Sequence, residues 1–211
     1  MAVQFIIGAS GTGKSEYIYR KMIEQSMNKQ HTPILFILPE QANMAAEQDM
    51  VSLHPYGGTM DISILSFTRL AYQVFDKNNI YIGDVLDDYG KSMLLMKVIR
   101  DNSDKLTYYT GMSEKSGFID ELKSVISEFY QYRMTPDKID DILNNISPDR
   151  SIYHKLKDIK IIIDGFEAAM GDTYMVAEKM LTLLAKNVEA SDMLRNAEIY
   201  FDAFTGFTPI Q

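Results

Sequence analysis

Residues 3–15 read VQFIIGASGTGKS, and this stretch decides the fold class. Its first five residues, Val3 to Ile7, form an apolar run that is typical of a short buried strand. The next eight, GASGTGKS from Gly8 to Ser15, match the phosphate-loop pattern G-x-x-x-x-G-K-[ST] without a gap. From Ser15 to about Lys29, charged and apolar residues follow at helical spacing. Strand, loop and helix in this order are what a phosphate loop requires.

The loop is the candidate nucleotide-binding site. Its glycines let successive backbone N–H groups turn toward phosphate oxygens, and the helix that follows adds the positive end of its dipole. We expect Lys14 to reach the β and γ phosphates of ATP and the Ser15 hydroxyl to ligate Mg²⁺. The complete set of expected nucleotide-binding residues is Gly8, Ala9, Ser10, Gly11, Thr12, Gly13, Lys14 and Ser15.

Three strand-to-helix units follow one another in the first part of the chain. The second strand is ILFIL at 34–38, bounded by Pro33 and Pro39, and it precedes a helix over 42–53. The third runs from Asp61 to Leu65 and leads into a helix over 67–75. This alternation predicts a P-loop, RecA-like α/β fold, with a parallel sheet that carries helices on both faces.

From about Asp84 the strand-like runs stop, and helices are predicted at 85–101, 114–132 and 136–144. The run IKIIIDGF at 159–166 resembles a strand ending in a metal-binding Asp164. However, apolar residues from Leu156 to Met170 recur at steps of three and four, which favours a helix over 151–170. Ile199 to Phe201 are then the returning central strand. We therefore expect residues 1–83 and 151–211 to form the P-loop domain, with 84–150 as an inserted all-helical lobe.

The composition excludes several classes of site. The chain has 211 residues, 46% of them hydrophobic and 24% charged, as expected for a globular protein with a substantial core. Cysteine is absent, so thiol catalysis, disulfides and cysteine-ligated metal centres are excluded within these residues. The three histidines are scattered singly, and no catalytic residue stands out. No apolar stretch is long enough for a membrane helix and no secretory signal is recognisable, so we expect a cytoplasmic protein with no membrane partner.

The net charge of −8 is spread along the chain, and neither predicted domain is basic. A protein that holds DNA alone normally carries a positive patch, because neutralising phosphates supplies most of the non-specific affinity. Any nucleic-acid contact is therefore expected to be local or shared with a partner.

Hydrolysis of ATP needs more than the loop. A second strand must end in an acidic residue that holds Mg²⁺, and a further group must orient the attacking water. The candidate is FDAFTGFTPIQ at 201–211, in which Asp202 follows the strand and is the second expected Mg²⁺ ligand. The next residue is Ala203, whose methyl group cannot accept a proton or orient a water.

These segments together resemble a known family. Asp202, Phe204, Thr208, Pro209 and Gln211 resemble the second motif of UvrD/Rep-like helicases, D-E-F-Q-D-x-x-P-x-Q. With GASGTGKS, LPEQ at 38–41 and SFTRLAYQVF at 66–75, the chain is similar to the N-terminal region of AddB-type subunits of the bacterial ATP-dependent helicase/deoxyribonuclease. The resemblance covers essentially all 211 residues, although the helical middle adds little to it.

The resemblance implies a longer protein and a partner. AddB-type subunits carry a nuclease domain and an iron–sulfur cluster downstream, so this chain is expected to be an N-terminal fragment, with the cluster only in the missing C-terminal part. They pair with an AddA-type helicase/nuclease subunit in a heterodimer that processes DNA double-strand breaks. In such motors the segment matching Ser66, Phe67 and Arg69 follows the single strand, which makes these three the expected DNA-binding residues.

The departures from the family pattern limit what the chain is expected to do. Ala203 and Gly206 replace both acids of the D-E-x-x-D pattern. We therefore expect a nucleotide-binding helicase-like domain that is weak or inactive as an ATPase by itself. One alternative is an authentic P-loop ATPase or small-molecule kinase, and a second is a scaffold domain that binds no nucleotide.

Overall fold

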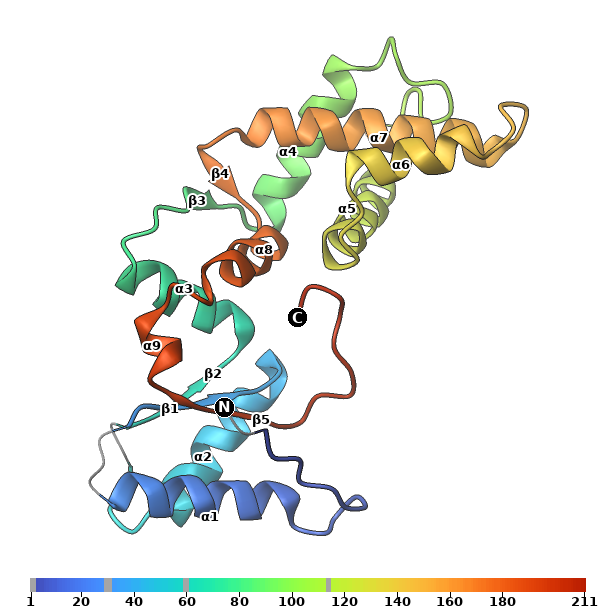
Figure 1. Cartoon of the computed structure of the whole chain (residues 1–211). Coiled ribbons are helices and arrows are strands. Elements are labelled where there is room, and N and C mark those ends of the chain that lie inside the picture. The colour runs from blue at the N-terminus through green and yellow to red at the C-terminus, as the bar shows by residue number, and fades with distance from the viewer. Residues whose placement is uncertain (1–2, 29–31, 59–60, 113–114) are drawn as a thin grey trace. The chain divides into compact units, whose positions relative to one another are not determined.

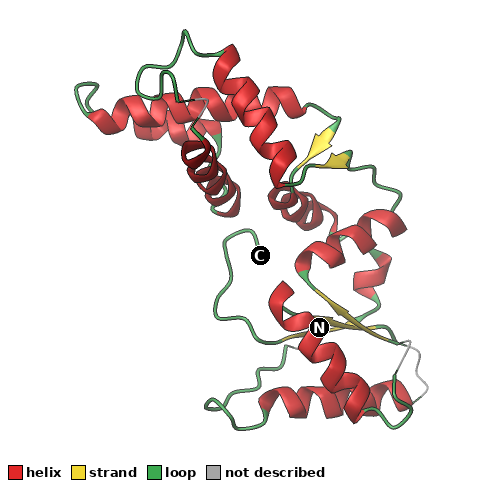
Figure 2. Ribbon diagram, turned by 180° about the vertical axis from the view of Figure 1, so that it is seen from behind, coloured by secondary structure: helices red, strands yellow, loops and turns green. Residues whose placement is uncertain are grey.

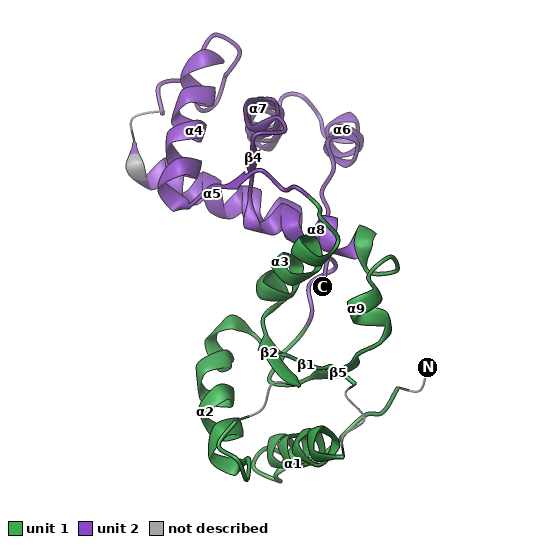
Figure 3. Ribbon diagram, turned by 90° about the vertical axis from the view of Figure 1, so that its left-hand side faces the viewer, with its two compact units in different colours: residues 1–80, 186–206 green, residues 81–185, 207–211 purple. Residues whose placement is uncertain are grey.

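The computed structural model describes residues 3–28, 32–58, 61–112 and 115–211. The chain forms two compact units (Figures 1 and 3). Unit 1 comprises residues 1–80 and 186–206, and unit 2 comprises residues 81–185 and 207–211. Figure 2 shows the helices and the two separate sets of strands. None of the helices formed by these described residues is long and apolar enough to cross a membrane.

Unit 1 contains a three-stranded parallel sheet in the order β2-β1-β5. Its strands are β1 (Ile34–Ile37), β2 (Ile62–Leu65) and β5 (Glu198–Phe201). Its helices are α1 (Lys14–Met27), the short 3-10 helix η1 (Glu40–Ala42), α2 (Asn43–Leu53), α3 (Phe67–Lys77) and α9 (Asp192–Arg195). The parallel α/β pattern and the strands expected near 34–38, 61–65 and 199–201 are confirmed.

Helices cover both faces of this sheet, as the sequence predicts. Figure 3 shows α1 and α2 on one face and α3 and α9 on the other. All four residues of β1 are buried, so alternate side chains enter a core on each face. Ile34 and Phe36 join the cluster formed with Ile18 and Met22 of α1. Burial on both faces explains why β1 reads as a continuous apolar run.

Two expectations about this sheet are wrong. Residues 3–7 form no strand, and Val3, Phe5 and Ile7 are 79–92% exposed. An apolar run becomes a strand only if it can pair with another strand, and no ladder bonds reach these residues among the described parts of the chain. Ile6 alone packs against the core cluster. The second correction concerns β5, which lies at the edge of the described sheet, while β1 is the central strand.

Unit 2 is mainly helical. Its helices are α4 (Asp88–Asp101), α5 (Ser116–Gln131), α6 (Pro136–Asn144), α7 (Ser151–Met170) and α8 (Ala177–Asn187), the last of which ends two residues into the segment counted with unit 1. Two short strands, β3 (Asp84–Val85) and β4 (Tyr174–Met175), pair in parallel. The helix expected over 151–170 is confirmed. Asp164 lies on its surface, where its carboxylate bonds Lys160 at 3.1 Å instead of ending a strand.

The division between the units differs from the expected division at residues 83 and 151, because α7 and most of α8 belong to unit 2. Helix α7 packs along α4 and α6. Its buried face contributes Ile162, Phe166 and Met170 to the same core as Leu95 and Ile99 of α4. The sequence shows that 151–170 is helical, but it does not show which core this helix completes.

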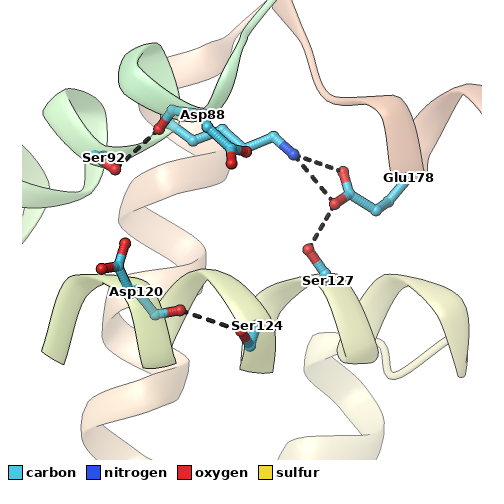
Figure 4. A network of polar contacts seen from close by, with 7 residues as sticks. Asp88, Ser92, Asp120, Ser124, Ser127 and Glu178 are labelled. Carbon is cyan, nitrogen blue, oxygen red and sulfur yellow. Dashed lines mark hydrogen bonds and ion pairs between the residues drawn. The ribbon is translucent and has the colours of Figure 1, made fainter. Parts of the chain in front are cut away.

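A polar network ties three helices of unit 2 together (Figure 4). The Lys91 ammonium of α4 bonds the Glu178 carboxylate of α8 at 3.1 Å, and the Ser127 hydroxyl of α5 donates to the same carboxylate at 2.5 Å. Burial by itself raises the pKa of Glu178. The bonds from Ser127, the backbone and Lys91 together outweigh it and hold this pKa below its ordinary value.

Candidate phosphate loop and nucleic-acid contact site

The glycine-rich loop that begins at Gly8 leads directly into α1. Gly11 and Gly13 have φ angles of 75° and 83°, in the left-handed region that glycine adopts most readily. Gly13 is the N-cap of α1, and no side chain caps this helix. The first N–H groups of α1 are therefore not satisfied by a side chain, and a helix N-terminus of this kind favours an anion.

Bonds within the loop hold its shape. The Lys14 ammonium donates to the carbonyl oxygens of Gly8 at 3.0 Å and Ala9 at 2.7 Å. The Thr12 hydroxyl donates to the same Ala9 oxygen at 2.8 Å. A Cβ on Gly8 would lie 2.6 Å from Thr12 Oγ1, so a larger residue here would displace the hydroxyl that bonds Ala9. Lys14 thus lies over the loop that it is expected to serve.

The expected magnesium ligands are both present in unit 1, but they do not form a ready metal cage. Ser15 is exposed on the first turn of α1. Asp202 follows β5, and its Oδ1 accepts from Ala203 N at 2.8 Å. After burial and the charge of Asp49, the charge of Asp202 also contributes to raising the pKa of Tyr19 in α1. Across the described residues, no group of three or more acidic or histidine side chains surrounds a metal position.

Ala203 has an unusual backbone. Its φ is 61°, one of three positive values among described residues other than glycine. This conformation is costly for a residue with a Cβ. The position directly after Asp202 is therefore a sharp turn as well as the place where the expected acid is missing.

The three expected DNA contacts have different environments. Ser66 is 4% exposed, and its Oγ accepts from Arg69 N at 3.3 Å, so it is the N-cap of α3. Phe67 packs against Phe201 and Phe204 at ring-centroid distances of 6.1 and 5.7 Å. Arg69 is half exposed and pairs with Glu47 at 3.2 Å. The structure brings Phe67 and Arg69 to the carboxyl end of the sheet, whereas Ser66 positions the helix that carries them.

The family of the chain follows from comparison with known proteins. The family model described as "ADDB, N-terminal" matches residues 5–211. The chain belongs to this family. A relative in Lachnoclostridium phytofermentans, named as a subunit of an ATP-dependent helicase/deoxyribonuclease, is 37% identical over 211 residues, which is 100% of this chain. Relatives of the same name in Clostridium botulinum and Ruminiclostridium cellulolyticum are 32% and 30% identical over 99% of it.

This member of the ADDB N-terminal family spans 18% of the length of these relatives. The matched region contains both compact units, so the helices of unit 2 belong to the family segment as fully as the sheet of unit 1 does.

Three further residues of unit 1 escape sequence reasoning in this family member. Tyr72 and Gln73 line an open hollow of about 400 Å³ together with Arg69. Asn43, the first residue of α2, is 5% exposed, and neither of its amide atoms has a hydrogen-bond partner in the described structure. The signal for Tyr72 and Gln73 is their spacing of three and four from Arg69 on one helix face. No sequence signal marks Asn43.

Proposed function

We propose that this chain is the nucleotide-holding and DNA-contacting N-terminal part of a subunit that processes DNA double-strand breaks together with an AddA-type helicase/nuclease subunit. The relatives' printed names combine helicase and deoxyribonuclease activities. The observation that carries the nucleotide part is the intact loop, in which Lys14 lies over Gly8 and Ala9 and Gly13 opens an uncapped α1. A cytoplasmic location is part of the same proposal.

Loop geometry supports nucleotide holding. A phosphate in the loop would accept hydrogen bonds from the first N–H groups of α1 and from the Lys14 ammonium. Lys14 would then bond phosphate oxygens in place of the carbonyl oxygens of Gly8 and Ala9. The oxygen donors of Ser15 and Asp202 suit Mg²⁺, which typically keeps several waters and shares phosphate oxygens. Such an ion would neutralise part of the phosphate charge. An iron–sulfur cluster would need cysteines from other parts of the full subunit, since this chain has none.

The P-loop, RecA-like form of the sheet belongs to this proposal. Ile199 and Phe201 of β5 are 41% and 50% exposed, so this edge strand offers apolar side chains as well as main-chain groups. Residues 3–7 are apolar and exposed, and they directly precede the loop. The parallel strand order β2-β1-β5 and the glycine loop directly before α1 support this form of the sheet.

Weak turnover follows from the end of β5. Ala203 and Gly206 supply no carboxylate to orient or deprotonate a water. Removing such a group commonly lowers a rate by about 10² to 10⁴. The chain would therefore hold ATP much longer than a motor domain does.

DNA contact is assigned to the carboxyl end of the sheet. Phe67 packs there against Phe201, and Arg69 lines a hollow together with Tyr72. Aromatic and guanidinium groups are the side chains that stack on bases and hold phosphates. The contact between Arg69 and Glu47 is exposed, so a phosphate could displace the carboxylate at little cost.

A titration of Mg-ATP by calorimetry tests the proposal and separates it from its alternatives. We expect saturable binding to the wild-type chain, loss of binding in Lys14→Ala, and unchanged binding in Lys77→Ala, a matched change at an exposed lysine of α3. Phosphate release is expected to stay slow with and without single-stranded DNA. Fast release would favour the ATPase or kinase alternative. Absence of Lys14-dependent binding would favour a scaffold that holds no nucleotide.

A further inference from the structure

A buried carboxylate organises one loop of unit 2. Asp158 of α7 is 0% exposed. Its Oδ2 accepts from the backbone N–H groups of Thr107, Tyr108 and Tyr109 at 3.0, 2.7 and 2.9 Å. The Thr107 hydroxyl also donates to Oδ1 at 3.1 Å. Consecutive N–H groups that converge on one anion form a rigid nest, so the backbone of 107–109 is fixed in place.

The two tyrosines of this loop have different tasks. Tyr109 packs its ring against Phe118 of α5 at 4.7 Å, and burial raises its pKa. Tyr108 is 42% exposed and touches Tyr109 edge to face at 5.0 Å. Tyr109 therefore serves the packing of the unit, while Tyr108 is a pre-positioned ring that reaches solvent.

A cation accompanies the exposed ring. The Lys155 ammonium lies 4.7 Å from the centroid of Tyr108. The neighbouring segments also carry Lys105, Arg150 and Lys157, together with the acidic residues Asp104 and Asp149. The charge of Glu121 of α5 acts on both Lys155 and Tyr109, and that of Asp158 also acts on Tyr109. Lys155 is therefore a cation held directly beside an exposed aromatic ring.

We propose that Tyr108 and Lys155 form a second contact for single-stranded DNA, in which a base stacks on the exposed part of the Tyr108 ring and the Lys155 ammonium holds an adjacent phosphate. Aromatic stacking together with a cation is how proteins bind single strands without reading their sequence. Asp158 is the positioning residue, because it fixes the loop that presents the ring. The inference rests on the proposed function only in taking DNA as the ligand.

Fluorescence anisotropy with the whole chain tests this contact. The probe is a labelled oligothymidine of about 20 nucleotides, beside an oligomer of the same length made of abasic sites. We expect Tyr108→Ala to weaken oligothymidine binding about five- to tenfold and to leave abasic binding unchanged, because the phosphates remain. Tyr108→Phe keeps the ring and is expected to bind like the wild type. Tyr89→Ala, at an 82% exposed tyrosine of α4, is the matched control.

Lys155→Gln tests the charged half of the contact. It is expected to reduce the slope of log affinity against log salt by about 0.7, the value for one phosphate of a single strand. Lys97→Gln, at an exposed lysine of α4, is the control. If Tyr108→Ala binds oligothymidine as Tyr89→Ala does, the contact is overturned while the proposed function stands. If the wild-type chain binds neither oligomer, both proposed DNA contacts are overturned. The proposal of nucleotide binding is then still tested by the ATP titration.

Discussion

The Lys91 ammonium and the Glu178 carboxylate form an ion pair at 3.1 Å whose side chains are only 15% and 16% exposed. The pair joins α4 to α8, and Ser127 adds α5 through its bond to the same carboxylate. Removing one member of such a pair leaves a poorly solvated charge without its partner. The stability of unit 2 therefore depends on this network.

Lys91→Met is expected to destabilise α8 by about 2 kcal/mol, somewhat less than for a fully buried pair because a sixth of each side chain reaches water. The measurement is the free energy of opening from amide exchange in α4 and α8. Lys123→Met is the matched control in the same unit, since the carboxylate of its partner Asp120 is 69% exposed. Its expected effect is below about 1 kcal/mol. Equal effects of the two variants would contradict the assignment.

The same network predicts a dependence on pH. The folded pKa of Glu178 lies below its ordinary value of 4.5, so its stabilising contribution is complete above about pH 4.5 and is lost as the pH falls through the lower folded value. The free-energy difference between the wild type and Glu178→Gln should therefore be present near neutral pH and shrink in acid. Urea denaturation of both proteins across this range measures it. A difference that grows as the pH falls would refute the assignment.

Gly165 permits the close approach of α7 and α4. A Cβ at this position would lie 2.7 Å from Val98 Cγ1 and 3.3 Å from Asn102 Nδ2. Gly165→Ala is therefore expected to destabilise unit 2 by about 1 to 3 kcal/mol, although alanine is the better helix former. Adding Val98→Ala should make the glycine substitution much less costly, because it removes the clashing methyl group. A double-mutant cycle measured by thermal unfolding would show this coupling, and simple additivity would contradict it.

Much of the fold follows from local sequence. The strand at 34–37 is bounded by two prolines, and helix α7 shows apolar steps of three and four, so each element carries its own signal. Residues 3–7 have an equally good strand signal, yet they form no strand, because pairing is a property of two segments. The same reason explains why α7 is expected in the P-loop domain but belongs to unit 2. The sequence specifies a helix at 151–170, but not the packing partner of that helix.

The candidate site divides in the same way. The loop and the start of α1 depend on eight consecutive residues and are predictable from them. The cluster of Phe67 with Phe201 and Phe204 joins segments far apart in the chain. The bond between Asp158 and Thr107 spans 51 residues. The N-cap role of Ser66 does have a sequence signal, because a serine stands directly before the helix that is expected from residue 67.

The left-handed backbone of Ala203 predicts an order among substitutions at this position. Valine is β-branched and fits this conformation badly, whereas glycine adopts it freely. We expect Ala203→Val to destabilise unit 1 by more than about 1 kcal/mol relative to Ala203→Gly. Amide exchange in β5 and β1 measures the difference. Equal stability of the two variants would mean that the turn after Asp202 is not held in this conformation.

Ala203→Glu is expected to leave phosphate release slow, even though it restores a carboxylate after Asp202. The new side chain would start from a left-handed turn at the end of β5. This backbone does not direct the carboxylate toward a water beside the loop. Hydrolysis also requires positive groups on the developing charge of the transferred phosphate, and an arginine in this role is worth about 10³ to 10⁵ in rate. A single carboxylate at position 203 supplies no such positive group. The measurement is phosphate release by Ala203→Glu, with single-stranded DNA present or absent. The double variant Ala203→Glu, Lys14→Ala shows how much of the release depends on Lys14. Strong DNA-stimulated release that depends on Lys14 would show that the missing carboxylate is the sole defect of this site.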